Sequence, residues 1–192
     1  YVEQAQGLLQ GGIDLFLIET CMDLLQIKAA MQACRRAMRS EGREVPIQVQ
    51  VTMETTGRML VGSEIGAALI ALQAMKPDVI GINCATGPAE MQEHLRHLSH
   101  HSPIPISVIP NAGMPSIVDG KTHYNLTPAQ LAEFHRHHVT DLGISIVGGC
   151  CGTTPEHLRQ VVEAVANLTP ARRKPELEPS VTSLYSAVPI VQ

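Results

Sequence analysis

Three cysteines that follow apolar runs are the residues of this chain best suited to chemistry. Cys150 and Cys151 lie inside a Gly-Gly-Cys-Cys-Gly segment that follows the apolar run 144–147. Cys84 ends a second apolar run, 79–84. Adjacent cysteines are poorly placed to form a disulfide with each other, because the bond needs well-separated Cα atoms. Three thiolates with an open fourth position are typical of catalytic zinc, so we interpret them as a zinc site that activates a small thiol substrate.

Two other interpretations of the cysteine pair stay open at the level of the sequence. Buried cysteines also pack as small hydrophobic side chains, and the pair by itself does not exclude this. The glycines on either side favour a binding loop, because they cost conformational entropy and let the backbone bend closely. A phosphate site is the other alternative, although no Lys or Arg lies next to the pair. Cys21 and Cys34 lack such a setting, and we interpret both as structural.

Polar residues also follow other predicted strands. Glu19 closes the apolar run 14–19, where an acidic group is unfavourable unless it meets a partner. We interpret Glu19 as the receptor for a substrate ammonium group, with a salt bridge to a neighbouring residue as the alternative. Asn111 takes the corresponding place just after the run 105–109.

Histidines gather on two predicted helices. The first group shares one helical face and the second crowds the following helix: His94, His97 and His101, then His135, His137 and His138. Metal ligands can show such spacing, but both groups fall on helices away from the strand ends. We therefore expect solvated helix surface here rather than a second metal site.

The elements that position these residues alternate along the chain. Nearly continuous apolar runs predict five buried strands: 14–19, 47–52, 79–84, 105–109, and a last one from 144 that carries Gly149 and Cys150 at its end. Helical periodicity and capping signals predict the helices: 1–10, 23–40, one capped by Ser63 and closed by Pro77, 89–99, one starting at Thr127, and 154–168. Residues 110–126 are expected to form a long loop.

Five strand–helix units in a row predict a parallel α/β sheet. Alternation alone permits either a doubly wound sheet or a barrel. Glu19, Cys84, Asn111 and Cys150 all lie at C-terminal ends of strands, which a barrel brings together around one mouth. We therefore favour a (β/α)8 TIM-type barrel, of which this chain supplies about the last five strand–helix units. The first three units are expected before Tyr1.

Composition narrows the class of protein. A chain of 192 residues suits one domain, and 44% hydrophobic residues can supply its core. The net charge of −4 gives no basic footprint for nucleic acid, and no apolar stretch is long enough to span a membrane. Five cysteines without a disulfide framework fit the reducing cytoplasm. Residues 1–168 are expected to form the barrel part, and the Pro-rich residues 169–192 a linker or docking tail toward a following domain.

Several segments resemble the homocysteine-binding zinc barrel of the cobalamin-dependent methionine synthase family. They are Gly81–Pro88, Pro110–Gly113 and Gly148–Pro155, together with Glu19-Thr20 at the end of its strand. The similarity covers about residues 1–168, which corresponds to the C-terminal part of that barrel. The tail resembles the connection to the folate domain.

The resemblance implies roles for individual residues. The three cysteines would hold zinc, and the homocysteine sulfur would take the open position. Glu19 would receive the substrate amino group, with Thr20 and Asn83 as further substrate-binding residues. Asn111 matches an asparagine that can cap the metal when homocysteine is absent.

The resemblance also implies a reaction and partners. Zinc-bound homocysteine thiolate would accept a methyl group from methylcobalamin to give methionine, with cobalamin and folate bound by other domains of the same polypeptide. One alternative is a homocysteine methyltransferase that uses betaine or S-methylmethionine without cobalamin, and another is a non-catalytic zinc-binding module. The family holds the substrate carboxylate with the first barrel strand, expected before Tyr1, so we expect this chain to be inactive alone.

Overall fold

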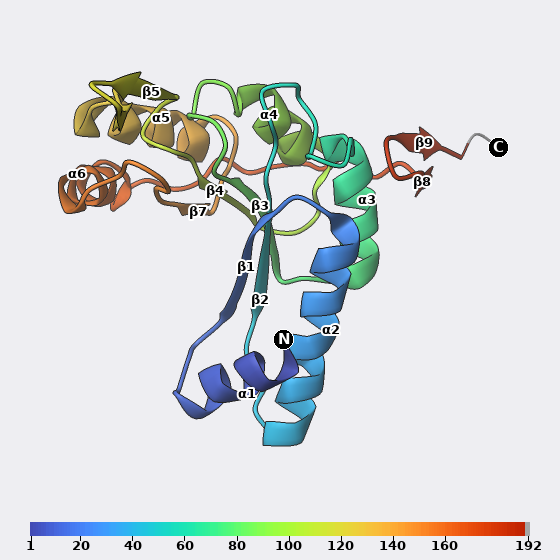
Figure 1. Ribbon diagram of the computed structural model, residues 1–192. Helices are drawn as coiled ribbons and strands as arrows, with labels where there is room; N and C mark the ends of the chain where they lie inside the picture. The colour runs from blue at the N-terminus through green and yellow to red at the C-terminus, as the bar shows by residue number, and fades with distance from the viewer. Residues whose placement is uncertain (191–192) are drawn as a thin grey trace.

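Five parallel strands form the centre of the molecule, and the computed structural model describes residues 1–190 (Figure 1). The strands are β1 (Phe16–Cys21), β2 (Ile47–Val51), β3 (Val79–Asn83), β4 (Ile106–Ile109) and β7 (Ile146–Val147). Each of these five strands pairs in parallel with the following one of the five, in the order β1-β2-β3-β4-β7. The predicted α/β class and the five parallel strands are confirmed.

Within residues 1–190, six helices alternate with these strands. They are α1 (Val2–Gln10), α2 (Leu24–Glu41), α3 (Ile65–Met75), α4 (Gln92–His101), α5 (Pro128–Thr140) and α6 (Pro155–Val165). Local signals fix several of their ends: Asp23 accepts a hydrogen bond from the Leu25 N–H, and Thr127 forms a capping box with Gln130. Figure 1 shows α1 and α2 beside β1 and β2, whereas α5 and α6 lie at the other end of the sheet.

The two faces of the sheet differ in polarity. Residues that face the helices are apolar and form the main core, as Val49, Ile80 and Val108 do, each 0% exposed. The opposite face carries buried amides: the Nε2 atoms of Gln48 and Gln50 donate to Ser107 Oγ over 3.0 and 2.9 Å. Successive side chains of a strand point to opposite faces of the sheet, which separates the apolar residues from the buried polar ones. The face that packs against the helices therefore supplies the hydrophobic core.

Two local predictions are wrong. Ser63 does not cap α3: the N-cap residue is Glu64, and the buried Ser63 hydroxyl has no partner in residues 1–190. Residues 110–126 are not one loop, because they contain the antiparallel hairpin of β5 (Pro115–Val118) and β6 (Lys121–Tyr124). Asp119 and Gly120 form its turn with φ of 51° and 73°, and an Asp-Gly pair is a strong hairpin signal.

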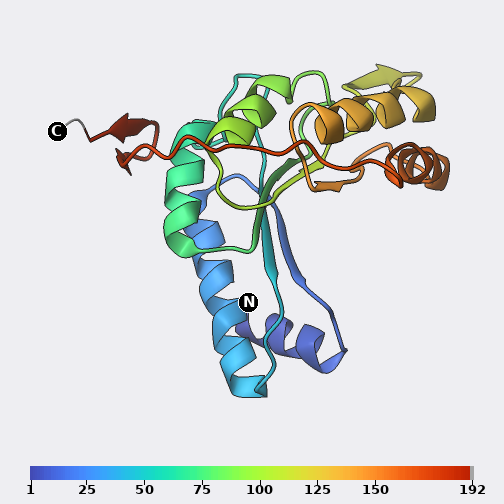
Figure 2. The same ribbon diagram turned by 180° about the vertical axis from the view of Figure 1, so that it is seen from behind.

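The tail beyond α6 lies against the rest of the molecule. Figure 2 shows it crossing the side of the molecule that faces the viewer, from α6 to a second hairpin beside α3, formed by β8 (Ser180–Thr182) and β9 (Ala187–Pro189). The Ala171 N–H donates to Val139 O, and the Glu64 N–H donates to Tyr185 O. Residues 191–192 of the predicted linker or docking tail lie outside the described residues.

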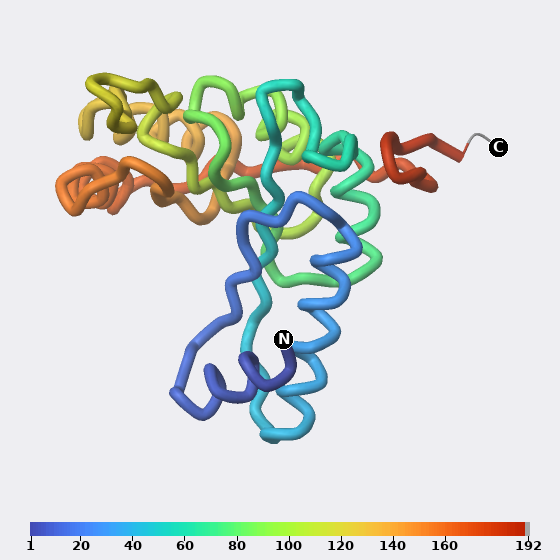
Figure 3. The backbone as a smooth tube through the Cα atoms, in the orientation of Figure 1, coloured from blue at the N-terminus to red at the C-terminus, as the bar shows by residue number. Residues whose placement is uncertain are grey.

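Within residues 1–190, β1 and β7 each pair with one neighbour and form the edges of the sheet, and the tube in Figure 3 follows the chain from β1 in blue to β7 in orange. A complete (β/α)8 barrel has eight strands, and the assignment of these five to the last units of one remains a prediction. None of the helices within residues 1–190 has the length and apolar content needed to cross a bilayer.

Candidate metal centre

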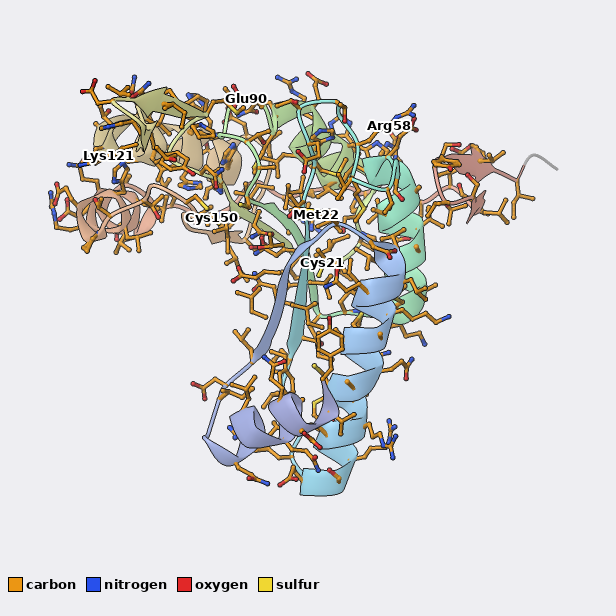
Figure 4. The ribbon with its side chains drawn as sticks, viewed as in Figure 1. Cys21, Met22, Arg58, Glu90, Lys121 and Cys150 are labelled. Atoms are coloured by element: carbon orange, nitrogen blue, oxygen red, sulfur yellow. The ribbon has the colours of Figure 1, made fainter. Side chains whose placement is uncertain are left out.

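The three cysteines converge at the C-terminal ends of two strands. Cys84 directly follows β3, while Cys150 and Cys151 lie in the loop between β7 and α6. The Cys84 and Cys151 sulfurs are 3.7 Å apart, those of Cys150 and Cys151 are 3.9 Å apart, and all three lie within 4.8 Å of one another. Figure 4 labels Cys150 near the strand ends and Lys121 at the outer edge, on the β5–β6 hairpin.

The sulfur positions fit a zinc ion. Tetrahedral ligands at a Zn–S distance of about 2.3 Å lie about 3.8 Å from each other, which agrees with the Cys84–Cys151 and Cys150–Cys151 sulfur separations. Within the described residues, these cysteines are the only group of three or more His, Cys, Asp or Glu side chains close enough to share an ion. Three soft thiolates favour zinc over magnesium or calcium, which prefer oxygen ligands.

The electrostatics of the cluster favour a bound cation. Burial raises the pKa of the Cys150 thiol to about 12, and the neighbouring sulfurs of Cys84 and Cys151 add to the rise. Three thiolates cannot share this volume without a compensating positive charge, because like charges disfavour ionisation. A metal ion reverses this effect, since a coordinating thiol is deprotonated outright.

The backbone around Cys84 adopts an uncommon conformation. Cys84 and Ala85 have φ of 62° and 60°, in the left-handed region that non-glycine residues rarely occupy. Such conformations persist only where the surrounding structure holds them, and they gather at functional sites. The Cys84 N–H donates to Ile109 O on the neighbouring strand, which helps to hold this turn.

Asn111 supports the cysteine loop. Its side-chain oxygen accepts from the Cys151 N–H over 3.1 Å, and the next residue, Ala112, donates its N–H to Cys151 O. Asn111 is only 3% exposed. Its oxygen therefore orients a cysteine in this structure, and service as a labile metal ligand would require the side chain to turn.

Asn83 and Thr20 form two hydrogen bonds with each other. The Thr20 N–H donates to Asn83 Oδ1, and Asn83 Nδ2 donates to Thr20 Oγ1, both over 2.9 Å. Asn83 Nδ2 also lies 4.0 Å from the Cys150 sulfur. This pairing holds the irregular C-terminal end of β1, where Thr20 has φ of 57° and the register with β2 shifts between Ile18 and Cys21. The Glu19 carboxylate is exposed and forms no salt bridge within residues 1–190, so the sequence-based alternative of an ion pair finds no support there.

Tyr124 is a site residue that sequence reasoning missed. A Cβ atom at Gly152, where φ is 80°, would lie 2.2 Å from Tyr124 Cγ, so the ring packs directly on the cysteine loop. Burial and the nearby charge of Cys151 raise the pKa of the Tyr124 hydroxyl. The signal was present in the sequence as the Asp-Gly turn, which predicts that β6 returns the chain to the strand ends.

The expectation for the histidines is wrong for two of them. His135 and His138 are 0% exposed rather than solvated, because α5 turns this face toward the sheet. They are not ligands of the cysteine cluster. His137, between them, is exposed and pairs with Asp141 and Glu133.

Comparison with known proteins assigns the family. Residues 1–165 match the family model described as homocysteine S-methyltransferase. The chain belongs to this family. Among curated members, it is 56% identical over 192 residues to the methionine synthase of Mycobacterium tuberculosis, and 54% identical over 197 residues to that of Mycobacterium leprae. All of the chain matches, but it spans only 16% of the length of either relative.

Solved structures of the homocysteine S-methyltransferase family share the fold. The apo form of homocysteine methyltransferase MmuM from Escherichia coli aligns with a TM-score of 0.60, covering 85% of this chain and 57% of that one. The metallated form aligns with a TM-score of 0.59 over 84% of this chain and 51% of that one. Sequence identity is 22% in both cases, so these structures support the barrel-type architecture alone.

Proposed function

We propose that this chain is part of a zinc-dependent homocysteine S-methyltransferase domain that converts homocysteine to methionine with methylcobalamin as methyl donor. The observation that carries the proposal is the convergence of the Cys84, Cys150 and Cys151 sulfurs at the strand ends. Membership of the homocysteine S-methyltransferase family supplies the substrate class. Three cysteines leave one tetrahedral position for a fourth sulfur, as catalytic zinc sites do.

Different residues of this chain would bind the zinc ion and the substrate. Cys84, Cys150 and Cys151 would hold the zinc, which when bound keeps a coordinated substrate thiol in its nucleophilic thiolate form. Glu19, exposed and unpaired among the described residues, would bind the substrate ammonium group. Thr20 would contact the substrate beside it.

The surrounding residues would orient these groups. Asn83 holds the backbone at Thr20, near the end of β1, and lies beside Cys150, so it would fix the distance between the ammonium site and the sulfurs. Asn111 would move between the Cys151 N–H and the metal as substrate leaves. Tyr124 covers the cysteine loop from the hairpin side and would restrict access of water.

Similarity to the mycobacterial methionine synthases supports methylcobalamin as the donor. The identity to them is 54–56%, whereas MmuM shares 22% and shows only a common fold. Because those relatives are about six times longer than the matched part, cobalamin- and folate-binding domains of the same polypeptide are the proposed partners. A cytoplasmic location is proposed because all five cysteines are unpaired, as a reducing compartment favours.

A titration of the full-length protein, loaded with Co2+ in place of zinc, tests the function. Homocysteine should change the visible absorption of the cobalt, because a further sulfur enters the metal site. A closed, non-catalytic site would leave the spectrum unchanged. Methyl transfer to homocysteine is then measured with methylcobalamin, betaine and S-methylmethionine, and turnover with either of the last two but not with the first would contradict the proposed donor.

A further inference from the structure

A row of hydrogen bonds runs from α4 through α5 to the cysteine loop. Gln92 Nε2 lies 3.1 Å from His138 Nε2, and His138 Nδ1 lies 3.2 Å from His135 Nδ1. His135 Nε2 lies 2.7 Å from the carbonyl oxygen of Gly148, two residues before Cys150. Both imidazoles are 0% exposed, and the proposed chemistry uses neither.

The Gly148 carbonyl needs this donor because the sheet cannot supply one. The Gly148 N–H donates to Val108 O over 3.1 Å, and the Cys150 N–H donates to Pro110 O over 2.7 Å. Bonds in a parallel ladder are evenly spaced, so the rung between these two would run from the N–H of residue 110 to the Gly148 carbonyl. Proline has no N–H, and His135 fills the gap.

The Gly148 carbonyl also determines which ring nitrogens of His135 and His138 carry a proton. Because Gly148 O can only accept, His135 must carry its proton on Nε2, which leaves Nδ1 as an acceptor. His138 therefore donates from Nδ1, and its Nε2 accepts from the Gln92 amide. Each ring nitrogen then has one partner and both imidazoles are neutral. Burial lowers the pKa of His135 to about 4 and that of His138 to about 3, which agrees with this assignment.

We infer that His135 is a positioning residue for the metal centre: it replaces the rung that Pro110 cannot form and thereby fixes the peptide that leads into Cys150. His138 and Gln92 in turn hold the His135 ring. The inference rests on the proposed metal site. Without the bond, Gly148 and Gly149 would gain conformational freedom, and the cysteines would be less well prepared for a metal ion. Residues that orient metal ligands typically change the affinity by about 10- to 100-fold when mutated.

Cobalt titration of the metal-free, full-length protein tests this inference, with the thiolate-to-cobalt absorption as the readout. His135→Phe removes the donor while filling the space, and His135→Gln keeps an N–H donor at the position of Nε2. His137→Phe is the matched control, because His137 lies on the same helix with a side chain 61% exposed. We expect about 10- to 100-fold weaker cobalt binding for His135→Phe, and binding within about threefold of the parent for the other two variants.

The outcomes separate this inference from the proposed function. If the parent binds cobalt and a folded His135→Phe binds it within about threefold as tightly, the positioning role is wrong while the metal site stands. Equal losses in His135→Phe and His135→Gln would also overturn the role, because ring bulk rather than the donated bond would then matter. Should circular dichroism show that His135→Phe does not fold, His135→Leu takes its place with the same criteria. A parent that binds no cobalt overturns the metal site itself, and the inference with it.

Discussion

Two of the candidate cysteine ligands lie next to asparagine side chains. Asn111 orients Cys151, and Asn83 joins Thr20 to the surroundings of Cys150. Left-handed backbone at Thr20 and Cys84 costs roughly 1–3 kcal/mol per residue. These supporting hydrogen bonds offset that cost, so the proposed site depends on residues that orient the cysteines as well as on the cysteines themselves.

The first prediction concerns the ammonium receptor. Glu19→Gln keeps the shape of the side chain and removes its charge, so homocysteine should bind about 10- to 150-fold more weakly, which corresponds to roughly 1.5–3 kcal/mol. Calorimetry on the zinc-loaded full-length protein measures this affinity, and metal analysis should find zinc retained. Glu3→Gln on the exposed face of α1 is the control. Unchanged affinity for Glu19→Gln would assign this residue a structural role.

The second prediction compares two cysteines. Cys151→Ala should release most of the bound zinc, because two thiolates hold the ion poorly. Cys34→Ala should retain the zinc and lower only the free energy of unfolding, since Cys34 is buried in α2 away from the cluster. Metal content after gel filtration distinguishes the two variants. Full zinc retention in Cys151→Ala would remove Cys151 from the ligand set.

At the scale of elements, the β5–β6 hairpin belongs to the site. The Ala112 N–H bonds to Cys151 O at the start of the hairpin segment, and the Leu126 N–H bonds back to Ala112 O after β6. Tyr124 at the end of β6 lies on Gly152. The hairpin therefore covers the cysteine loop, and its position depends on the absence of a side chain at residue 152.

The third prediction compares two glycines with similar backbones. Gly152 and Gly120 have φ of 80° and 73°, but an added Cβ meets Tyr124 at Gly152 and nothing within 4 Å at Gly120. Gly120→Ala should cost only the left-handed conformation, about 1–2 kcal/mol. Gly152→Ala should cost more and weaken cobalt binding as well, because the hairpin and the loop must separate. Urea unfolding and cobalt titration measure the two effects, and equal behaviour of both variants would show that Tyr124 moves freely.

At the scale of the whole molecule, buried polar groups lie on both sides of the sheet. The face away from the helices carries Gln48, Gln50 and Ser107, and the helix side carries the neutral pair of His135 and His138 under α5. The histidine pair connects the stability of the fold to pH, because burial makes both rings harder to protonate in the folded chain than in the unfolded one.

The fourth prediction follows from that pair. The folded-state pKa values of about 4 and about 3 lie below the ordinary value of 6.5, so the unfolded chain binds protons first as the pH falls. The stabilisation is complete above pH 6.5 and is lost below it, by about 1.4 kcal/mol per pH unit for each histidine until the folded values are reached. Urea unfolding of the metal-free protein at pH 7.5 and 5.5 measures the change. His135→Gln should show a smaller difference between the two pH values, and an identical difference would contradict the assignment.

Much of the fold could be predicted from local pattern. The apolar runs predicted all five parallel strands, and the helix start predicted at Thr127 is confirmed by its capping box. These features depend on residues close in the chain, where periodicity and capping act directly. The β5–β6 hairpin was missed although its Asp-Gly turn is a local signal, and Ser63 was assigned a cap one residue too early.

The sequence determined which residues would meet, and the tertiary structure decided how they are held. Placement at strand ends was enough to predict that Cys84 and the Cys150–Cys151 pair come together, because parallel strands end at one edge. The buried row through His135 and His138 could not be predicted, since it requires α5 to turn one face toward the sheet at the level of Pro110. The spacing of these residues in the sequence does not determine where α5 lies along the sheet. The packing of the helix on the sheet determines this position, and that packing involves residues far apart in the chain.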